Sequence, residues 1–388
     1  MEIKIKENKT TEFGLIPSDW QIKEFQDVMS GFFSGATPYR GRPEYYKGQI
    51  NWITSGELNY NIITDTNEKI TEEAVRNTNL KILPKGTFLF AITGLEAEGT
   101  RGSCAITGID ATTNQSCMAL FPFESLDVKY LYHYYVWKGK MLALRYCQGT
   151  KQQSYTGKIA RKLPIIIPPT KSEQTAIATA LSDTDARIEN REKLIAKKRN
   201  IKQGLMQELL KPESNWILTS VGEVATIRKG EQLNKDTLTA QGQYPVMNGG
   251  IQPSGYTDKW NQNPNTIIIS EGGNSCGYVN FIKTRFWQGG HCYSVDAKIH
   301  KHFLYHLLKF HEKEIMGLRV GSGLPNIQRN RLIEFSLSIP DREKQHAIAL
   351  VLDEINEVIT AMENKLQKYK MVKQGMMQAL LTGKIRLA

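Results

Sequence analysis

The chain has 388 residues, with 50 lysines and arginines against 39 acidic residues, which gives a formal net charge of +11. Hydrophobic residues make up 40% of the chain, a value typical of a globular protein and unlike that of a disordered tail or a disulfide scaffold. Apolar runs such as 165–167 fall far short of the roughly 20 residues that cross a bilayer, so no membrane span is expected. Five cysteines without a CxxC pair favour the reducing cytoplasm.

The strongest pattern in the sequence is an internal duplication, which predicts two related globular regions, or heads. Most of the length that the second copy lacks falls between Thr54 and Thr87 of the first copy. The matching segments, in order, are Trp20 with Trp216, 131–133 with 304–306, 163–168 with 335–340, and 202–210 with 373–381.

Each copy predicts a globular region of short strands and one short helix, followed by a long helix, and therefore an α+β protein. Ser172 and Asp341 are the expected N-caps of the two long helices. The short helices are expected at 128–144 and 301–316, and strands at 50–54, 87–93, 245–248, 266–270 and 277–282.

The long helices carry apolar residues at alternating steps of four and three, the spacing of a coiled-coil seam. We expect the two helices to pair as an antiparallel coiled coil that separates two pseudo-two-fold-related heads. The alternative, that each helix only covers its own head, stays open. The expected seam residues are Ile177, Leu181, Ile188 and Ile195 in the first helix, and Ile348, Leu352, Ile355, Ile359, Met362 and Leu366 in the second.

Signatures of catalysis are missing from the sequence: it has no phosphate-binding loop, dinucleotide fingerprint, HExxH, GxSxG, kinase or methyltransferase motif. Histidines cluster between His300 and His311, but no spacing typical of zinc ligands supports a metal site, so no metal is expected. Isolated carboxylates such as Asp65 and Glu271 are interpreted as solvated surface groups. The chain by itself is expected not to be an enzyme.

Positive charge is concentrated in the first copy, where nine basic residues and no acidic residue lie between Asp127 and Glu173. This segment includes a polar loop at 149–155 (GTKQQSY), whose counterpart in the second copy is 321–329 (GSGLPNIQR). Basic residues bind phosphates, and Gln, Asn and Arg can read base edges. A solvated surface loop is the alternative for any single residue.

The two polar loops differ in sequence although the copies around them agree, which predicts two DNA specificities and a bipartite target with an unread gap. The candidate DNA-contact residues are Thr37, Arg40, Arg42, Arg101, Lys151, Gln152, Gln153, Tyr155 and Lys158 in the first copy, and Asn274, Ser322, Asn326, Gln328, Arg329 and Arg331 in the second.

Residues 34–46 (SGATPYRGRPEYY) and 50–58 (INWITSGEL) closely resemble the start of a target recognition domain in specificity subunits of type I restriction–modification systems (HsdS). The run from Pro168 to Ala178 and the LLTGK sequence ending at Lys384 also resemble helical regions of that family. The resemblance covers nearly the whole chain. It implies recognition domains at 1–165 and 212–338, a central helix at 166–211 and a C-terminal helix at 339–388.

By this resemblance, the chain is expected to be a non-catalytic, cytoplasmic DNA specificity subunit. Its expected partners are double-stranded DNA, two methylation subunits (HsdM) and motor–nuclease subunits (HsdR). S-adenosylmethionine, ATP and magnesium are expected on the partners, and no cofactor on this chain. The second recognition domain lacks the Thr-Pro-x-Arg and Trp motifs, with Val246 at the position of Trp52, which implies another recognition subtype. The rival hypothesis is a scaffold protein with two ligand-binding heads on a coiled-coil spacer.

Overall fold

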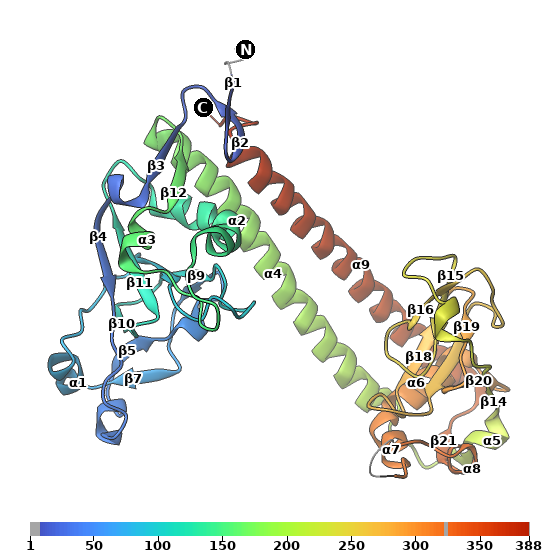
Figure 1. The fold of residues 1–388 in the computed structure, drawn as a ribbon. Helices are drawn as coiled ribbons and strands as arrows, with labels where there is room; N and C mark the ends of the chain where they lie inside the picture. The colour runs from blue at the N-terminus through green and yellow to red at the C-terminus, as the bar shows by residue number, and fades with distance from the viewer. Residues whose placement is uncertain (1–7, 322–324, 388) are drawn as a thin grey trace. The chain divides into compact units, whose positions relative to one another are not determined.

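The structure, a computed structural model, describes residues 8–321 and 325–387 (Figure 1). The chain forms two compact units: unit 1 comprises Met1–Asn190 and Leu366–Ala388, and unit 2 comprises Arg191–Lys365. The two longest helices, α4 (Lys171–Leu209) and α9 (Arg342–Leu380), each contribute a part to both units. Within the described residues, no helix combines the length and apolarity that a membrane crossing requires.

The head of unit 1 contains a five-stranded sheet in the order β4-β11-β8-β9-β6, a three-stranded sheet β10-β5-β7, and the pairs β12-β3 and β1-β2. Its core lies between the large sheet and α2, where Tyr135 packs against Phe88 and Phe90. The elements are β1 (Asn8–Thr11), β2 (Gly14–Pro17), β3 (Gln21–Glu24), β4 (Met29–Ser34), β5 (Ile50–Ile53), β6 (Asn61–Ile63), β7 (Glu68–Ile70), α1 (Glu72–Asn77), β8 (Phe88–Ala91), β9 (Cys104–Thr107), β10 (Ala111–Thr113), β11 (Cys117–Pro122), α2 (Val128–Tyr146), α3 (Gly157–Arg161) and β12 (Pro164–Ile167).

The head of unit 2 repeats this plan with a four-stranded sheet β14-β20-β17-β18, a three-stranded sheet β16-β15-β19 and the pair β13-β21. The four strands follow one another in the sheet as β4, β11, β8 and β9 do in unit 1, so the topology confirms the duplication. The elements are β13 (Ile217–Ser220), α5 (Val221–Val224), β14 (Ala225–Lys229), β15 (Tyr244–Met247), β16 (Gly255–Thr257), β17 (Thr266–Ser270), β18 (Val279–Ile282), β19 (Trp287–Gln288), β20 (Cys292–Ala297), α6 (Lys301–Phe310), α7 (Glu312–Gly317), α8 (Arg329–Ile333) and β21 (Ser336–Ile339).

The expected strands and short helices are found within a few residues of their predicted bounds, with one difference. The helix expected at 301–316 is divided at His311 into α6 and α7. Asp341 caps α9, because its Oδ1 accepts from the amide of Lys344 at 2.9 Å. The prediction of Ser172 as the other N-cap is wrong: α4 begins at Lys171, and Thr170 Oγ1 accepts from the amide of Glu173 at 3.2 Å.

The three-stranded sheets of the two heads differ at the position of the Trp motif. In unit 1, Trp52 of β5 lies opposite Thr112 on the parallel neighbour β10. In unit 2, Val246 of β15 lies opposite Trp287 on the parallel neighbour β19. A tryptophan thus stands on the adjacent strand in unit 2, but Trp287 is half-buried whereas Trp52 is 1% exposed, so the two rings are not packed alike.

In unit 1, the start of α4 lies against the end of α9, because Ile177 and Leu181 share the head's core with Met377 and Leu380. Beyond this core, Lys373 Nζ lies 2.5 Å from Asp185. The end of α9, the helix that follows the second head, is thus part of the core of the first head, so the alternative that each helix only covers its own head is wrong.

In unit 2 the roles are exchanged, and the start of α9 lies against the end of α4. Ile348 and Leu352 share that head's core with Leu210, and Arg199 pairs with Glu363 at 2.6 Å. The two helices are thus antiparallel within each unit, as predicted. All ten expected seam residues are buried or half-buried.

The chain's C-terminal residues return to the first head. Arg386 forms a bidentate ion pair with Glu173, a residue of α4 that is 5% exposed, and its Nη1 lies 3.0 Å from Asp19. These contacts tie the last residues of the chain, the start of α4 and the N-terminal strands together within unit 1.

A histidine connects the short helix of each head to its long helix. In unit 1, His133 Nε2 of α2 lies 2.9 Å from Ser182 Oγ of α4; in unit 2, His306 Nε2 of α6 lies 2.9 Å from Asp353 Oδ1 of α9. Burial, assisted by the charge of Lys373, lowers the pKa of His133 from its usual 6.5 to about 3. Burial also lowers the pKa of His306, although Asp353 opposes that shift.

The buried, neutral His133 predicts a pH-dependent stability. Between about pH 6.5 and 3 the unfolded chain takes up a proton at this residue and the folded chain does not. The contribution of neutral His133 to the free energy of unfolding is therefore complete above pH 6.5. It declines by about 1.4 kcal/mol per pH unit as the pH falls through this window. Urea unfolding from pH 7.5 to 5 should show a shallower decline for His133→Gln than for the wild type, with His291→Gln as the exposed control. Equal slopes for His133→Gln and the wild type would contradict this prediction.

Candidate nucleic-acid interface

The polar loop of unit 1 follows α2 and is held to the segment after β8 by its backbone. The amide of Leu95 donates to the carbonyl of Gln153 at 3.0 Å, and the amide of Tyr155 donates to the carbonyl of Ile92 at 2.8 Å. Gln148 and Ser154 exchange two further backbone hydrogen bonds that close the loop.

The polar loop of unit 2 is attached in the same way to the segment after β17. The amide of Gly273 donates to the carbonyl of Pro325 at 3.0 Å, and the amide of Ile327 donates to the carbonyl of Glu271 at 2.8 Å. Val320 and Asn326 close this loop with two backbone hydrogen bonds. Because the bonds use only backbone atoms, the side chains of the two loops can differ while the frame stays the same.

Glycine begins both loops for a steric reason. Gly149 and Gly321 have φ values of +101° and +95°, in the region that favours glycine. A Cβ on Gly149 would also lie 2.1 Å from the carbonyl oxygen of Gln152. The turn that presents the loop in unit 1 therefore needs glycine at this position.

The candidate residues of the first polar loop fall into two groups. Lys151, Gln152 and Lys158 have exposed side chains, and Gln153 is half-buried. Tyr155 is 3% exposed and its ring lies 6.1 Å from that of Phe90, so its prediction as a surface contact is corrected to a core residue.

Two candidate arginines donate hydrogen bonds to backbone carbonyls near the polar loops. In unit 1, Arg101 donates to the carbonyls of Leu95 and Glu96, both at 2.8 Å. In unit 2, Arg329 donates through Nε and Nη2 to the carbonyl of Ile227. Their donors are used to fix the backbone around the polar loops.

Thr37, Arg40 and Arg42 lie beside the three-stranded sheet of unit 1. Arg40 forms a bidentate pair with Glu68 at 2.5 and 2.8 Å, and its guanidinium lies 4.2 Å from the centre of the Tyr46 ring. The hydrogen bond that Arg40 donates to Glu68 raises the pKa of Arg40 and lowers that of Glu68. The side chains of Thr37 and Arg42 also have partners, Gln115 Oε1 at 2.6 Å and the Tyr45 hydroxyl at 2.9 Å.

Most of the candidates in unit 2 that the structure describes are exposed. Asn274, Asn326, Gln328 and Arg331 are exposed. Gln328 precedes α8 as its N-cap residue, but its side chain makes no capping hydrogen bond. Ser322 lies outside the described residues.

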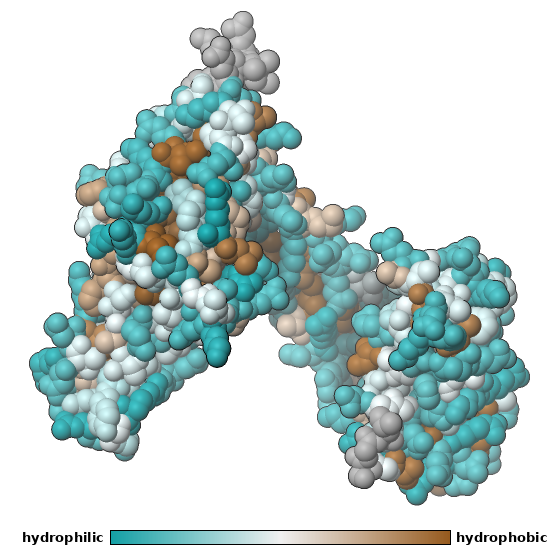
Figure 2. All heavy atoms as spheres, viewed as in Figure 1, coloured by the Kyte–Doolittle hydropathy of each residue, from teal (hydrophilic) through white to brown (hydrophobic). Residues whose placement is uncertain are grey.

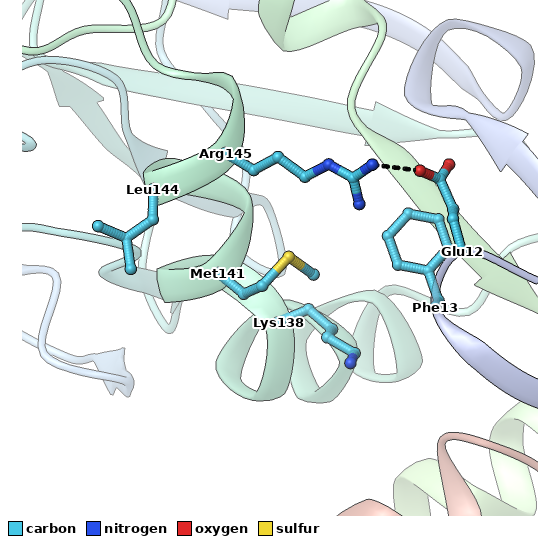
Figure 3. A pocket seen from close by; sticks show the side chains of 6 residues that line it. All are labelled: Glu12, Phe13, Lys138, Met141, Leu144 and Arg145. Carbon is cyan, nitrogen blue, oxygen red and sulfur yellow. Dashed lines mark hydrogen bonds and ion pairs between the residues drawn. The ribbon is translucent and has the colours of Figure 1, made fainter.

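The basic segment of the first copy does not form one surface. Arg145 pairs with Glu12 at 2.5 Å, and Lys140 with Glu98 at 2.7 Å. Figure 3 shows Arg145 reaching from α2 to Glu12 beside Phe13, in a pocket of about 510 Å³ that Lys138, Met141 and Leu144 also line. Lys140 and Arg145, two of the nine basic residues in the segment, are therefore paired with acids elsewhere in the head, whereas Lys151, Lys158 and Lys162 in and after the polar loop are exposed.

Figure 2 shows a face of the molecule that is largely hydrophilic, with apolar side chains in small patches.

The environment of one carboxylate of unit 2, Glu271, could not be predicted from the spacing of residues in the sequence. Glu271, interpreted as a solvated carboxylate, has only 12% of its side chain exposed. Its Oε1 lies 2.6 Å from Lys229 Nζ and 3.0 Å from the Tyr293 hydroxyl. Lys229 and Tyr293 were missed because they stand on strands far from Glu271 in the sequence.

The turn at Gly149 gives a direct test of the loop frame. Gly149→Ala should destabilise unit 1 by about 1–3 kcal/mol, because the new Cβ meets the carbonyl of Gln152 at positive φ. Gly157→Ala is the matched control: nothing lies within 4 Å of its Cβ, and alanine favours α3. Urea unfolding and amide exchange at Ser154 measure the difference. Equal stability of the two variants would contradict the proposed loop geometry.

Comparison with known proteins gives the family. Residues 17–197 and 213–370 match the family described as type I restriction modification DNA specificity domain. The chain is 26% identical to the MjaIX type I restriction enzyme specificity subunit of Methanocaldococcus jannaschii, over 98% of this chain and 97% of that protein. It is 34% identical to a putative type I specificity subunit of Mycoplasma pneumoniae, over 39% of this chain and 43% of that protein.

Solved structures agree at the level of the fold. The S subunit of a type I restriction–modification system from M. genitalium superposes with a TM-score of 0.69 at 18% identity, covering 93% of this chain and 96% of that one. A chain from a study of complex assembly and conformational transition in a type I system gives a TM-score of 0.55 at 16% identity, covering 95% and 99%. With two matched segments that span both heads, the chain belongs to the type I restriction–modification DNA specificity family.

Proposed function

We propose that this chain is the DNA sequence-specificity subunit of a type I restriction–modification complex, in which each head reads one half of a bipartite, asymmetric target. The observation that carries the proposal is the pair of polar loops. Both are held by the same backbone hydrogen bonds, yet they present different exposed side chains. A common loop backbone with two different sets of exposed side chains is suited to the recognition of two unlike half-sites.

Binding in this proposal divides into positioning and reading. Exposed lysines such as Lys151 and Lys158 contact phosphates, which fixes each head on the duplex. Exposed amides such as Gln152, Asn326 and Gln328 can make paired hydrogen bonds with base edges. The antiparallel helices α4 and α9 set the unread gap, because each helix is anchored in a core at both ends.

The chain itself is proposed to be non-catalytic and to act in the cytoplasm with two methylation subunits and with motor–nuclease subunits. The named relatives are specificity subunits of restriction enzymes, and one structural neighbour comes from a study of complex assembly. S-adenosylmethionine, ATP and magnesium then belong to the partners, which methylate or cleave the DNA that this chain selects.

Exchange of one head tests the proposal. Replacing residues 1–165 with the first recognition domain of another family member should change one half of the methylated motif and leave the other half and the gap intact. Single-molecule sequencing of host DNA reports the motif. A change in both halves, or in neither, would contradict the assignment of one head to one half-site.

The salt dependence of binding tests the phosphate contacts. Lys151→Met should weaken binding to every DNA sequence alike. It should also make the fall of log K with log salt less steep, by about 0.9 in slope. Lys129→Met is the control, since it lies at the other end of α2, roughly 25 Å from the loop by helix rise. The measurement is a filter-binding titration with the assembled complex. Weak, salt-insensitive binding by the wild type would instead favour a protein-binding scaffold.

A further inference from the structure

The sheet of unit 2 brings three polar side chains into one row at the edge that carries the polar loop. Lys229 ends β14 and lies opposite Tyr293 of β20. Tyr293 lies opposite Ile269 of β17, and Glu271 follows directly after that strand. The row Lys229–Tyr293–Glu271 thus joins three segments that are distant in the sequence.

Glu271 holds this row together. Its Oε1 lies 2.6 Å from Lys229 Nζ and 3.0 Å from the Tyr293 hydroxyl. Burial and the hydrogen bond with Glu271 raise the pKa of Tyr293, so the phenol stays protonated. The other oxygen, Oε2, is buried, has no hydrogen-bond partner among the described residues, and lies 3.8 Å from Nδ1 of the exposed His291.

Lys229 has a different environment from its partner. Its side chain is 54% exposed, whereas that of Glu271 is 12% exposed. An ammonium group has three donors, and Glu271 takes one of them. The buried carboxylate therefore fixes the direction of the lysine and leaves donors for a ligand at the surface.

The row is directly connected to the polar loop. The Tyr293 hydroxyl lies 3.1 Å from the carbonyl of Ile327, and the amide of Ile327 donates to the carbonyl of Glu271. Lys229 therefore stands beside the same loop that presents Asn326 and Gln328.

The first head has no such row, although its strands have the same register. Met118 of β11 lies opposite Ser34 of β4 and Phe90 of β8, and Ile92 occupies the place of Glu271. Met118 and Ile92 are both buried. These positions at the strand ends carry no charged residue in one copy and two charged residues in the other. The charged row is therefore not required by the fold and points to a difference in what the two heads read.

We propose that Lys229, positioned by Glu271, is a specificity-determining residue of the second head that donates to a base edge with two acceptors, such as O6 and N7 of guanine in the major groove. This inference rests on the proposed function. A lysine paired with a buried carboxylate displaces few counterions from DNA, because its charge is already compensated. Its oriented donors suit a base edge better than the diffuse charge of a phosphate backbone.

The test compares Lys229→Met, Glu271→Gln and Lys283→Met in the full chain assembled with its methylation subunits. Lys283 is the matched control because it follows Ile282, which lies opposite Thr266 at the far end of β17. The two readouts are the methylated motif and the salt slope of binding. Lys229→Met should relax discrimination about 10- to 100-fold at one base of one half-site, with little change in slope.

Glu271→Gln should relax the same base position and steepen the salt slope by up to about 0.9, because the charge of Lys229 is no longer compensated. A role of Glu271 only in folding would lower affinity without moving either readout in this way. Lys283→Met should leave the motif as in the wild type. Thermal unfolding checks each variant, and Glu271→Gln decides alone if Lys229→Met does not fold.

Two results would overturn the inference. If Lys229→Met makes the salt dependence of binding less steep by about 0.9 in slope and keeps the motif, Lys229 is a phosphate contact. If the motif and the affinity are both unchanged, Lys229 does not touch the DNA. In either case the wild type still selects a bipartite motif, so the proposed function stands; a wild type without a defined motif would remove the proposed function itself.

Discussion

The fold depends on the burial of the long helices at both of their ends. Ile177 and Leu181 of α4 enter the core of the first head together with Met377 and Leu380 of α9. The burial of each aliphatic side chain contributes about 1.5–3 kcal/mol to the free energy of unfolding. Neither the head alone nor the helix ends alone would bury all of these side chains. Arg386 reinforces this junction by pairing with the buried Glu173. The same exchange of helix ends in unit 2 makes each unit a product of both halves of the chain.

This architecture separates what must be constant from what can vary. The polar loops are held by backbone hydrogen bonds, by glycines at positive φ and by arginines that donate to carbonyl groups. None of these requires a particular side chain at the exposed loop positions. Recognition can therefore change by substitution at the surface while the strand order and the helix contacts are kept, which is what comparison of the two heads reveals.

Charge is also organised locally. The basic segment looks like a single phosphate footprint when it is read along the chain. In the structure, Lys140 and Arg145 of this segment pair with Glu98 and Glu12, and Arg101, which lies before the segment, binds backbone carbonyls. A charge that already has a partner contributes less to nonspecific DNA binding, so the exposed lysines of the polar loop and α3 carry more weight than the net charge suggests.

Much of the fold could be predicted because the relevant signals are local or repeated. The helix seam follows from steps of three and four residues, the duplication from comparing one stretch with another, and the replacement of Trp52 by Val246 from aligning the copies. The site was less predictable, since residue types in a polar loop do not reveal which way each side chain points. Tyr155 shows the difficulty: it stands among exposed polar residues, yet its ring belongs to the core.

The sequence by itself determined two related heads, two long helices with apolar seams, and polar loops that diverge within a common frame. Only the tertiary structure decided which charges are paired and which groups stand together. Lys229 and Tyr293 lie on strands β14 and β20, and Glu271 follows directly after β17; the neighbours of these strands are set by the order of strands in the sheet. That order is fixed by the packing of the whole head, so no pattern along the chain could have placed a buried carboxylate beside the lysine.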